Sequence, residues 1–349
     1  MKNIKLFSTE QEQLDAVLEP TYVAYNEETG LVTCVKPKSG GGSIEEEYKG
    51  RTITCTIELH SEFDDFRGEP YDLAQPVILC MTPTISEAAG LNPDELGTTS
   101  IGLDVEKIIF HDVETQPRVL EYEGTKIEGL YFFDNYGTYT YTIVLKEKPK
   151  HLNAAFAFSG YYGSPDVTLI SVDISNLDTS DVEEAIAVFN HCLSLTEVVG
   201  IEKLIQGKCV NISGLFIACY NLESINFGGW DISNVKNMTG MLTSCFIGFN
   251  EGSEGFESYY KNYTLDLTNW DISKVTIMNE AFSCGSNVIK MGGNPESLET
   301  CEDMFNGEIP GTFYYNYAYD YSKILAVLPE TWTAIPCDLV DGVLVESPV

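Results

Sequence analysis

The side chains best suited to chemistry are few in this chain of 349 residues, which has four histidines and ten cysteines. His191 directly precedes Cys192, but adjacency in sequence does not make a nucleophile and its general base. No segment matches the GxxxxGK[ST], GxSxG or HExxH motifs. Acidic clusters such as residues 62–65 lack the ligand spacing of an EF-hand. We therefore predict no catalytic residue, no metal ligand and no cofactor, and expect a protein that is not an enzyme.

Aromatic residues are the better candidates, because tyrosine offers large amphipathic contacts at low entropic cost. They gather in three stretches, at residues 160–163, 246–262 and 307–321. The candidate ligand-contacting residues are Tyr161, Tyr162, Phe256, Tyr259, Tyr260, Tyr314, Tyr315, Tyr317 and Tyr319. The alternative is that these tyrosines pack loops onto the body of the protein or form an oligomer interface.

The charge of the chain excludes several classes of partner. It has 20 Lys and Arg against 53 Asp and Glu, a net charge of −33. Such a surface repels nucleic acid and anionic lipid. With no apolar run as long as a membrane span, the sequence predicts no nucleic-acid binding and no membrane insertion.

A repeated pattern in the second half of the chain must position the aromatic stretches. Segments 177–182, 230–235 and 270–275 align without gaps, and apolar residues recur three, six and seven positions after the last residue of each. We call this last residue the leading residue of its repeat. The five leading residues are Val182, Cys209, Val235, Val275 and Leu298, and in three repeats a cysteine follows ten positions later.

This spacing is typical of one face of a helix, and Ser180, Ser233 and Ser273 stand where an N-cap is expected. Short β-like runs follow at 195–199, 222–227 and 288–291. A helix, a turn and a strand in each unit of about 25 residues predict an α/β solenoid of the leucine-rich-repeat type. Stretches 246–262 and 307–321 are then inserts that emerge on one edge.

Residues 230–245 resemble the BspA-type leucine-rich repeat, whose pattern is Trp-Asp-x-Ser-x-Val-x-x-Met-x-x-Met-Phe-x-x-Cys, and residues 270–284 match nearly as well. The resemblance covers about residues 165–330. It implies a leucine-rich-repeat fold and an adhesion or interaction module of a bacterial surface protein.

The N-terminal segment, residues 1–38, is too small to hold a core by itself. We expect a helix at 8–18 and a hairpin made by 22–25 and 31–35, with Tyr22, Tyr25, Leu31 and Val35 anchoring it to a partner. Residues 39–43 read as a flexible Gly/Ser linker. Residues 22–33 resemble the opening of virion structural proteins of Bacteroidetes-infecting phages, which implies docking onto other virion proteins.

Residues 44–150 are predicted to form a β-sandwich-like domain, with strands at 52–59, 75–81, 107–110, 119–122, 127–133 and 139–146. A hairpin turn is expected at 134–138. The predicted fold is therefore multidomain. A small helix-hairpin segment precedes the β-rich domain, the leucine-rich-repeat solenoid spans 151–335, and residues 336–349 form a C-terminal tail.

Together these features favour a non-enzymatic phage virion structural protein, such as a head or tail fibre or decoration. Its repeat edge would contact a host surface protein or glycan, and the chain would be a homo-oligomer. The N-terminus shows no signal peptide, which fits a virion protein synthesised in the host cytoplasm. One alternative is a bacterial surface adhesin with BspA-type repeats. Another is a polysaccharide-degrading tailspike, because carboxylates that pair in space are invisible in the sequence.

Overall fold

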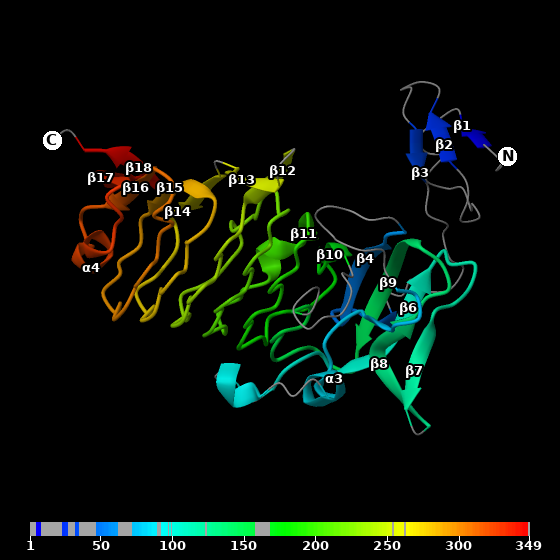
Figure 1. Cartoon of the computed structure of the whole chain (residues 1–349). Helices are drawn as coiled ribbons and strands as arrows, with labels where there is room; N and C mark the ends of the chain where they lie inside the picture. Colours follow the sequence, from blue (N-terminus) through cyan, green and yellow to red (C-terminus); the bar gives the residue numbers. More distant parts are fainter. Residues whose placement is uncertain are drawn as a thin grey trace. The chain divides into compact units, whose positions relative to one another are not determined.

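The computed structural model describes residues 5–7, 23–26, 32–34, 47–61, 72–88, 92–96, 98, 100–122, 124–157, 168–252, 255–261 and 263–347. Contacts divide the chain into two compact units, Met1–Lys49 and Gly50–Val349. The second unit is mostly β-structure with few helices, and it contains a β-solenoid (Figure 1).

The first unit contains a three-stranded sheet of β1 (Lys5–Phe7), β2 (Val23–Asn26) and β3 (Val32–Cys34). Strand β2 runs parallel to β1 and antiparallel to β3, with Tyr25 opposite Val32. The expected helix at 8–18, the linker at 39–43, and the anchoring candidates Tyr22, Leu31 and Val35 lie outside the described residues.

The second unit opens with a sandwich of two sheets. One sheet has the order β11-β10-β4-β9-β6, and the other has the order β5-β8-β7. Strands of the sandwich are β4 (Thr52–Leu59), β5 (Val77–Ile78), β6 (Val105–His111), β7 (Arg118–Tyr122), β8 (Thr125–Phe132) and β9 (Gly137–Leu145). Helix α3 (Pro83–Ala88) and the 3₁₀ turn η1 (Pro93–Leu96) follow β5. Alternation along β4 buries Ile53, Cys55 and Ile57, as a strand with one face toward a core requires.

Residues 134–138 do not form the expected hairpin turn, because β8 and β9 belong to different sheets. The chain crosses here from one layer to the other. Phe110 on β6 lies between the layers, with its ring centroid 5.1 Å from that of Tyr131 and 5.7 Å from that of Phe133. Packing of these aromatic rings across the sandwich outweighs the local turn signal.

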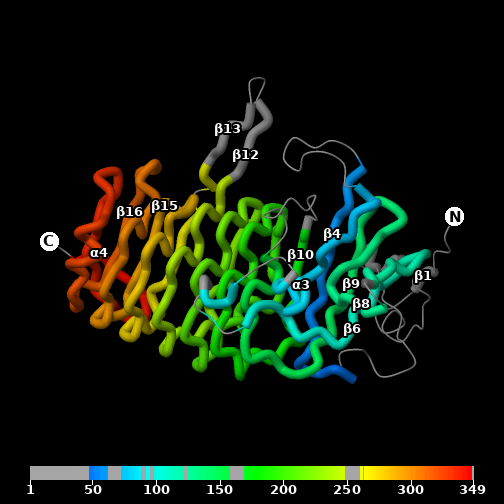
Figure 2. Tube along the Cα trace, turned by 60° about the horizontal axis from the view of Figure 1, so that its bottom comes forward, coloured from blue at the N-terminus to red at the C-terminus, as the bar shows by residue number. Residues whose placement is uncertain are grey.

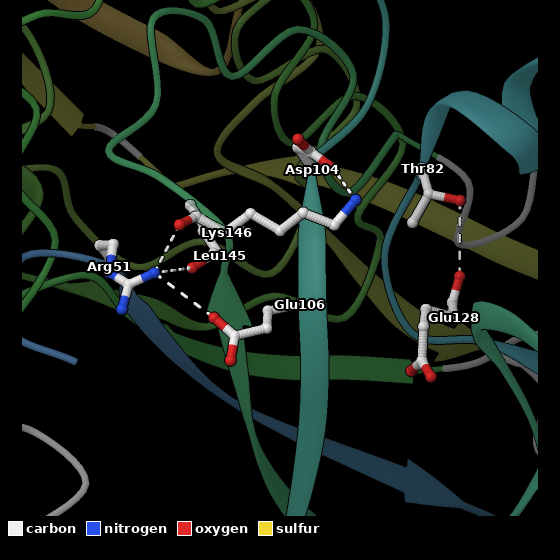
Figure 3. Close-up of polar contacts among 7 residues, drawn as sticks. All are labelled: Arg51, Thr82, Asp104, Glu106, Glu128, Leu145 and Lys146. Atoms are coloured by element: carbon white, nitrogen blue, oxygen red, sulfur yellow. Dashed lines mark hydrogen bonds and ion pairs between the residues drawn. The ribbon is translucent and has the colours of Figure 1, made fainter. Parts of the chain in front are cut away.

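Polar side chains hold the register of the larger sheet (Figure 3). Arg51, just before β4, donates from Nη1 to the carbonyl of Leu145 at 2.9 Å and approaches Glu106 Oε2 at 3.4 Å. Lys146 Nζ lies 2.7 Å from Asp104 Oδ1. These contacts join the beginning of β4 to the end of β9 and to β6 at the edge of the sheet.

The solenoid begins within the sandwich. Parallel β-bridges link one residue of each coil to the next in the order His151, Glu184, Asn211, Asn237, Ile277 and Thr300, which makes about six coils. Figure 2 shows them side by side from the sandwich to α4 (Ser322–Ala326). A first coil, led by buried Pro149, was missed in the sequence. Its Leu152, Ala155 and Phe156 repeat the spacing of three, six and seven positions and are buried.

The predicted helices of the repeats are wrong. In every coil but the last, the backbone N–H of the third, fifth and seventh residue after the leading residue donates to the next coil, as Ala185, Ala187 and Phe189 do to Asn211, Ser213 and Leu215. These donors are therefore unavailable for bonds four residues back within a helix. The apolar residues of the pattern are buried, but the backbone that carries them forms a series of turns in place of a helix.

The predicted serine N-caps are also wrong. The backbone N–H of Ser180, Ser233 and Ser273 each donates to an aspartate two residues earlier, at 3.1 Å in every case. This is an Asx turn, in which the carboxylate turns the chain. The Asp-x-Ser motif therefore shapes a corner of the coil and starts no helix.

Strands line the other side of the solenoid. They are β10 (Thr168–Asp173), β11 (Glu197–Val199), β14 (Tyr263–Leu267), β15 (Ser286–Met291), β16 (Gly311–Asn316) and β17 (Trp332–Val340), with β18 (Val343–Glu346) antiparallel to β17. The 3₁₀ turn η2 (Ile201–Lys203) follows β11. Strands β17 and β18, with the turn between them, include residues 336–346 of the expected C-terminal tail.

The expected strand at 222–227 is absent. The Tyr263 hydroxyl accepts a hydrogen bond from the N–H of Ile225 and donates one to its carbonyl, both at 3.1 Å, so these two backbone groups do not pair with a neighbouring strand.

One hydrophobic core runs from Ile53 in the sandwich to Trp332 in the last coil. Rings stack from coil to coil, with centroids 5.7 Å apart for Phe156 and Phe189 and 5.1 Å apart for Phe189 and Phe216. The sandwich therefore covers the first coil, whose apolar face would otherwise meet water.

Candidate functional site

The sheet β14-β15-β16-β17 carries the candidate site, because its outer face is polar and aromatic. Its parallel register aligns Asp266, Lys290, Tyr314 and Ile335 in one row across the strands. Their neighbours toward the core, such as Leu265 and Phe313, are fully buried. Lys290 Nζ lies 3.9 Å from Asp266 Oδ2, so the lysine is held beside Tyr314 by a weak surface ion pair.

The structure corrects the expected insert at 307–321, which contains strand β16 of this sheet. Tyr315 is half-buried, and its ring centroid lies 5.2 Å from that of Tyr321. Tyr321 is buried and donates from its hydroxyl to the carbonyl of Met291 at 3.0 Å. For Tyr315, the packing alternative therefore describes the environment better than ligand contact does.

Tyr317 and Tyr319 lie on the turn after β16 and are 54% and 40% exposed. The backbone N–H of Tyr317 donates to the carbonyl of Cys337 at 3.1 Å, so this turn runs beside the β17–β18 hairpin. That hairpin exposes Val340 and Val343. The aromatic and aliphatic side chains at this end of the strands are therefore exposed to solvent.

Tyr260 is at the other end of β16. Its hydroxyl donates to Glu308 Oε2 at 2.7 Å, and this hydrogen bond raises the pKa of Tyr260. The six residues of β16, at about 3.3 Å each, separate the two ends of the strand by roughly 20 Å. The expected single edge is thus divided into two places.

For two of the remaining candidate residues the structure gives a strand position, and two others lie outside the described residues. Phe256 and Tyr259 lie on β13 (Gly255–Tyr260), which pairs antiparallel with β12 (Ile247–Gly252), opposite Glu251 and Gly248. The stretch 246–262 is therefore a hairpin inserted before β14. Tyr161 and Tyr162 lie outside the described residues.

Nine cysteines in the described part of the chain are core residues. There, no group of three or more His, Cys, Asp or Glu is arranged to hold a metal ion. The nine cysteines from Cys55 to Cys337 are buried. Burial raises the pKa of Cys80 and of Cys209 to about 12, which suppresses the thiolate needed by a nucleophile. Among the described helices, none has the length and apolarity to span a bilayer.

Comparison with known proteins gives one family. Residues 159–283 and 254–308 match a family model described as a Mycoplasma protein of unknown function, DUF285. The two matches together cover residues 159–308, which is less than half of the chain. No curated protein and no solved structure matches the chain. One model therefore matches two overlapping segments of the chain.

Proposed function

We propose that the protein is a non-enzymatic recognition protein that binds a surface protein or glycan of another cell through the β14–β17 side of its solenoid. The observation that carries this proposal is the exposure of Tyr317 and Tyr319 on a turn held by the Cys337 carbonyl. Exposed aromatic rings on a stiff scaffold bind with little loss of conformational entropy. The row of Asp266, Lys290 and Tyr314 adds polar groups across the same sheet.

We further propose a phage virion as the setting, with the protein as a head or tail fibre or decoration. The N-terminal unit would dock onto other virion proteins, the BspA-type repeats would face outward, and the chain would form a homo-oligomer. Two features support this: the resemblance of residues 22–33 to virion proteins, and the separation of Met1–Lys49 from the rest of the chain in its contacts.

A binding experiment tests the recognition proposal. The fluorescently labelled full chain is mixed with a panel of Bacteroidetes strains, and bound protein is measured by flow cytometry. A double variant, Tyr317→Ala with Tyr319→Ala, removes two exposed rings without touching the core, so we expect binding to fall by about tenfold or more. The matched control is Glu197→Gln, an exposed residue on β11. Equal binding by the double variant and the control would refute the proposal.

A second experiment tests the setting. Mass spectrometry of purified phage particles should find the protein, and negative staining should show the structure that it forms. Recovery only in bacterial membrane fractions would favour the adhesin with BspA-type repeats. Release of reducing sugar from host capsule would favour the polysaccharide-degrading tailspike.

A further inference from the structure

A hollow of about 380 Å³ lies in the sandwich, far along the chain from the solenoid sheet. Residues 111–115, after β6, form one wall, and residues 135–140, at the crossing into β9, form the other. His111 and Thr140 are register partners on adjacent strands, so the floor belongs to the sheet. The volume is at the lower end of the range for small-molecule sites.

The lining combines hydrogen-bonding groups with aromatic rings. Asp112, Glu114 and Asn135 supply acceptors, and three threonines supply hydroxyls that both donate and accept. Tyr136 lines the hollow and is 43% exposed, so its ring is accessible to a ligand. No lysine or arginine is among these lining residues, which disfavours a phosphate, sulfate or carboxylate ligand.

The walls are held in place before any ligand arrives. The Tyr139 hydroxyl donates to the carbonyl of Asn135 at 2.6 Å, and its ring packs edge-on against Phe133 with centroids 4.5 Å apart. His111 Nε2 lies 2.8 Å from Thr142 Oγ1. Asp112 has a φ of 54°, which turns the chain sharply at the rim. A site organised in advance loses less entropy on binding.

We propose that this pocket binds a neutral carbohydrate. Polyhydroxylated sugars need closely spaced acceptors and donors for their hydroxyls and an aromatic face for their C–H groups, and the pocket supplies both. The described residues give no metal cluster here, so the carboxylates remain available to the sugar. The site is separate from the solenoid tyrosines, and the inference does not rest on the function proposed for them.

Saturation-transfer NMR of the full chain tests the proposal, with neutral oligosaccharides of glucose, galactose, mannose and N-acetylglucosamine as probes. We expect at least one probe to bind, and Tyr136→Ala to weaken its binding by about tenfold, which corresponds to about 1.4 kcal/mol. Asp112→Asn should weaken it similarly, because a neutral amide is a poorer acceptor than a carboxylate. Asparagine also tolerates the left-handed backbone at this position, so the variant should fold.

The matched control is Val199→Ala, which removes similarly exposed apolar surface from β11, outside both proposed sites, and should leave the affinity unchanged. Thermal unfolding of each variant serves as the check that it is folded. The proposal is overturned if no probe binds at up to about 10 mM. It is also overturned if sulfated or sialylated glycans bind as well as neutral ones, or if Tyr136→Ala and Val199→Ala behave alike.

Discussion

At the scale of single residues, the cysteines of the repeats have a structural role. The thiols of Cys192 and Cys219 lie 3.2 and 3.0 Å from the carbonyls of Phe156 and Phe189 in the preceding coil. Each sulfur is small enough for the crowded interior and donates a weak hydrogen bond between coils. The recurrence of cysteine ten positions after the leading residue therefore follows from packing.

Stability should decline at alkaline pH. Burial raises the pKa of Cys80 and Cys209 from 9.0 to about 12, so the folded state keeps protonated thiols that the unfolded chain would ionise. This contribution is complete below pH 9 and is lost as the pH rises toward 12. Urea unfolding between pH 8 and about pH 11 should show the loss, and Cys80→Ala should reduce its slope. An unfolding free energy that stays constant over this interval would contradict the prediction.

At the scale of elements, each coil contains a left-handed residue five positions after its leading residue. The residues are Ala154, Ala187, Gly214, Gly240, Glu280 and Asp303, with φ between 50° and 63°. The left-handed region costs residues other than glycine roughly 1–2 kcal/mol. Glycine stands at two of these positions, and elsewhere the stacked coils impose the conformation.

Exchanging residues at this position should change stability in opposite directions. Glu280 is exposed with φ 55°, so Glu280→Gly should stabilise the fold by about 1 kcal/mol, while Gly240→Ala should destabilise it by about as much. At Gly240 an added Cβ would be 3.4 Å from Thr243 Oγ1, so backbone strain dominates. Urea unfolding measures both changes.

The matched control is Glu302→Gly, at an exposed glutamate outside the left-handed set. It should destabilise by about 0.5–1 kcal/mol, because glycine only adds freedom to the unfolded chain. If Glu280→Gly and Glu302→Gly shift the unfolding free energy equally, the left-handed residue carries no strain.

The sequence predicted the buried residues of five coils correctly, because apolar spacing reports which side chains face a core. It did not predict the backbone between them, since a helix and a curled coil bury the same positions. The sequence does not reveal a left-handed position where the residue is Ala187 or Glu280, because only glycine is a recognisable sign of a positive φ. The coil led by Pro149 was missed because a proline leads it, whereas Val, Cys or Leu leads the five recognised repeats, although Leu152, Ala155 and Phe156 obey the spacing.

The candidate site was predictable only in part. Exposure of Tyr317 and Tyr319 agrees with their choice as ligand contacts, whereas the half-buried Tyr315 does not. The sequence indicated an insert where strand β16 runs, because its aromatic residues were counted without the alternation that buries Phe313. The sandwich pocket was not predicted, because its two walls come from segments about twenty residues apart.

At the scale of the whole molecule, charge is distributed along the stacked coils of the solenoid. Lys208 and Asp181 in successive coils form an exposed ion pair, as do Lys148 and Asp178. Such pairs contribute little each, and 53 acidic residues greatly outnumber 20 basic ones. Like-charge repulsion between coils therefore remains and opposes the compact state.

Added salt should stabilise the protein. Screening shortens the Debye length from about 30 Å at 0.01 M to about 8 Å at 0.15 M, so repulsion between distant carboxylates weakens while the buried core is unaffected. Circular dichroism in sodium chloride should show a midpoint that rises by several degrees across this interval. If charge screening is the cause, choline chloride should raise the unfolding midpoint as much as sodium chloride does. A midpoint that falls with either salt would contradict the argument.

The coils and the sandwich have different roles in the fold, and this difference determines how the length of the solenoid can change during evolution. Each coil contacts only its neighbours, whereas the sandwich covers the first coil and the β17–β18 hairpin ends the last sheet. Duplication or loss of one internal unit of about 26 residues would alter the length by about 4.8 Å and leave both ends intact. The reach of the tyrosine-bearing end can therefore be adjusted in fixed steps by whole-repeat recombination.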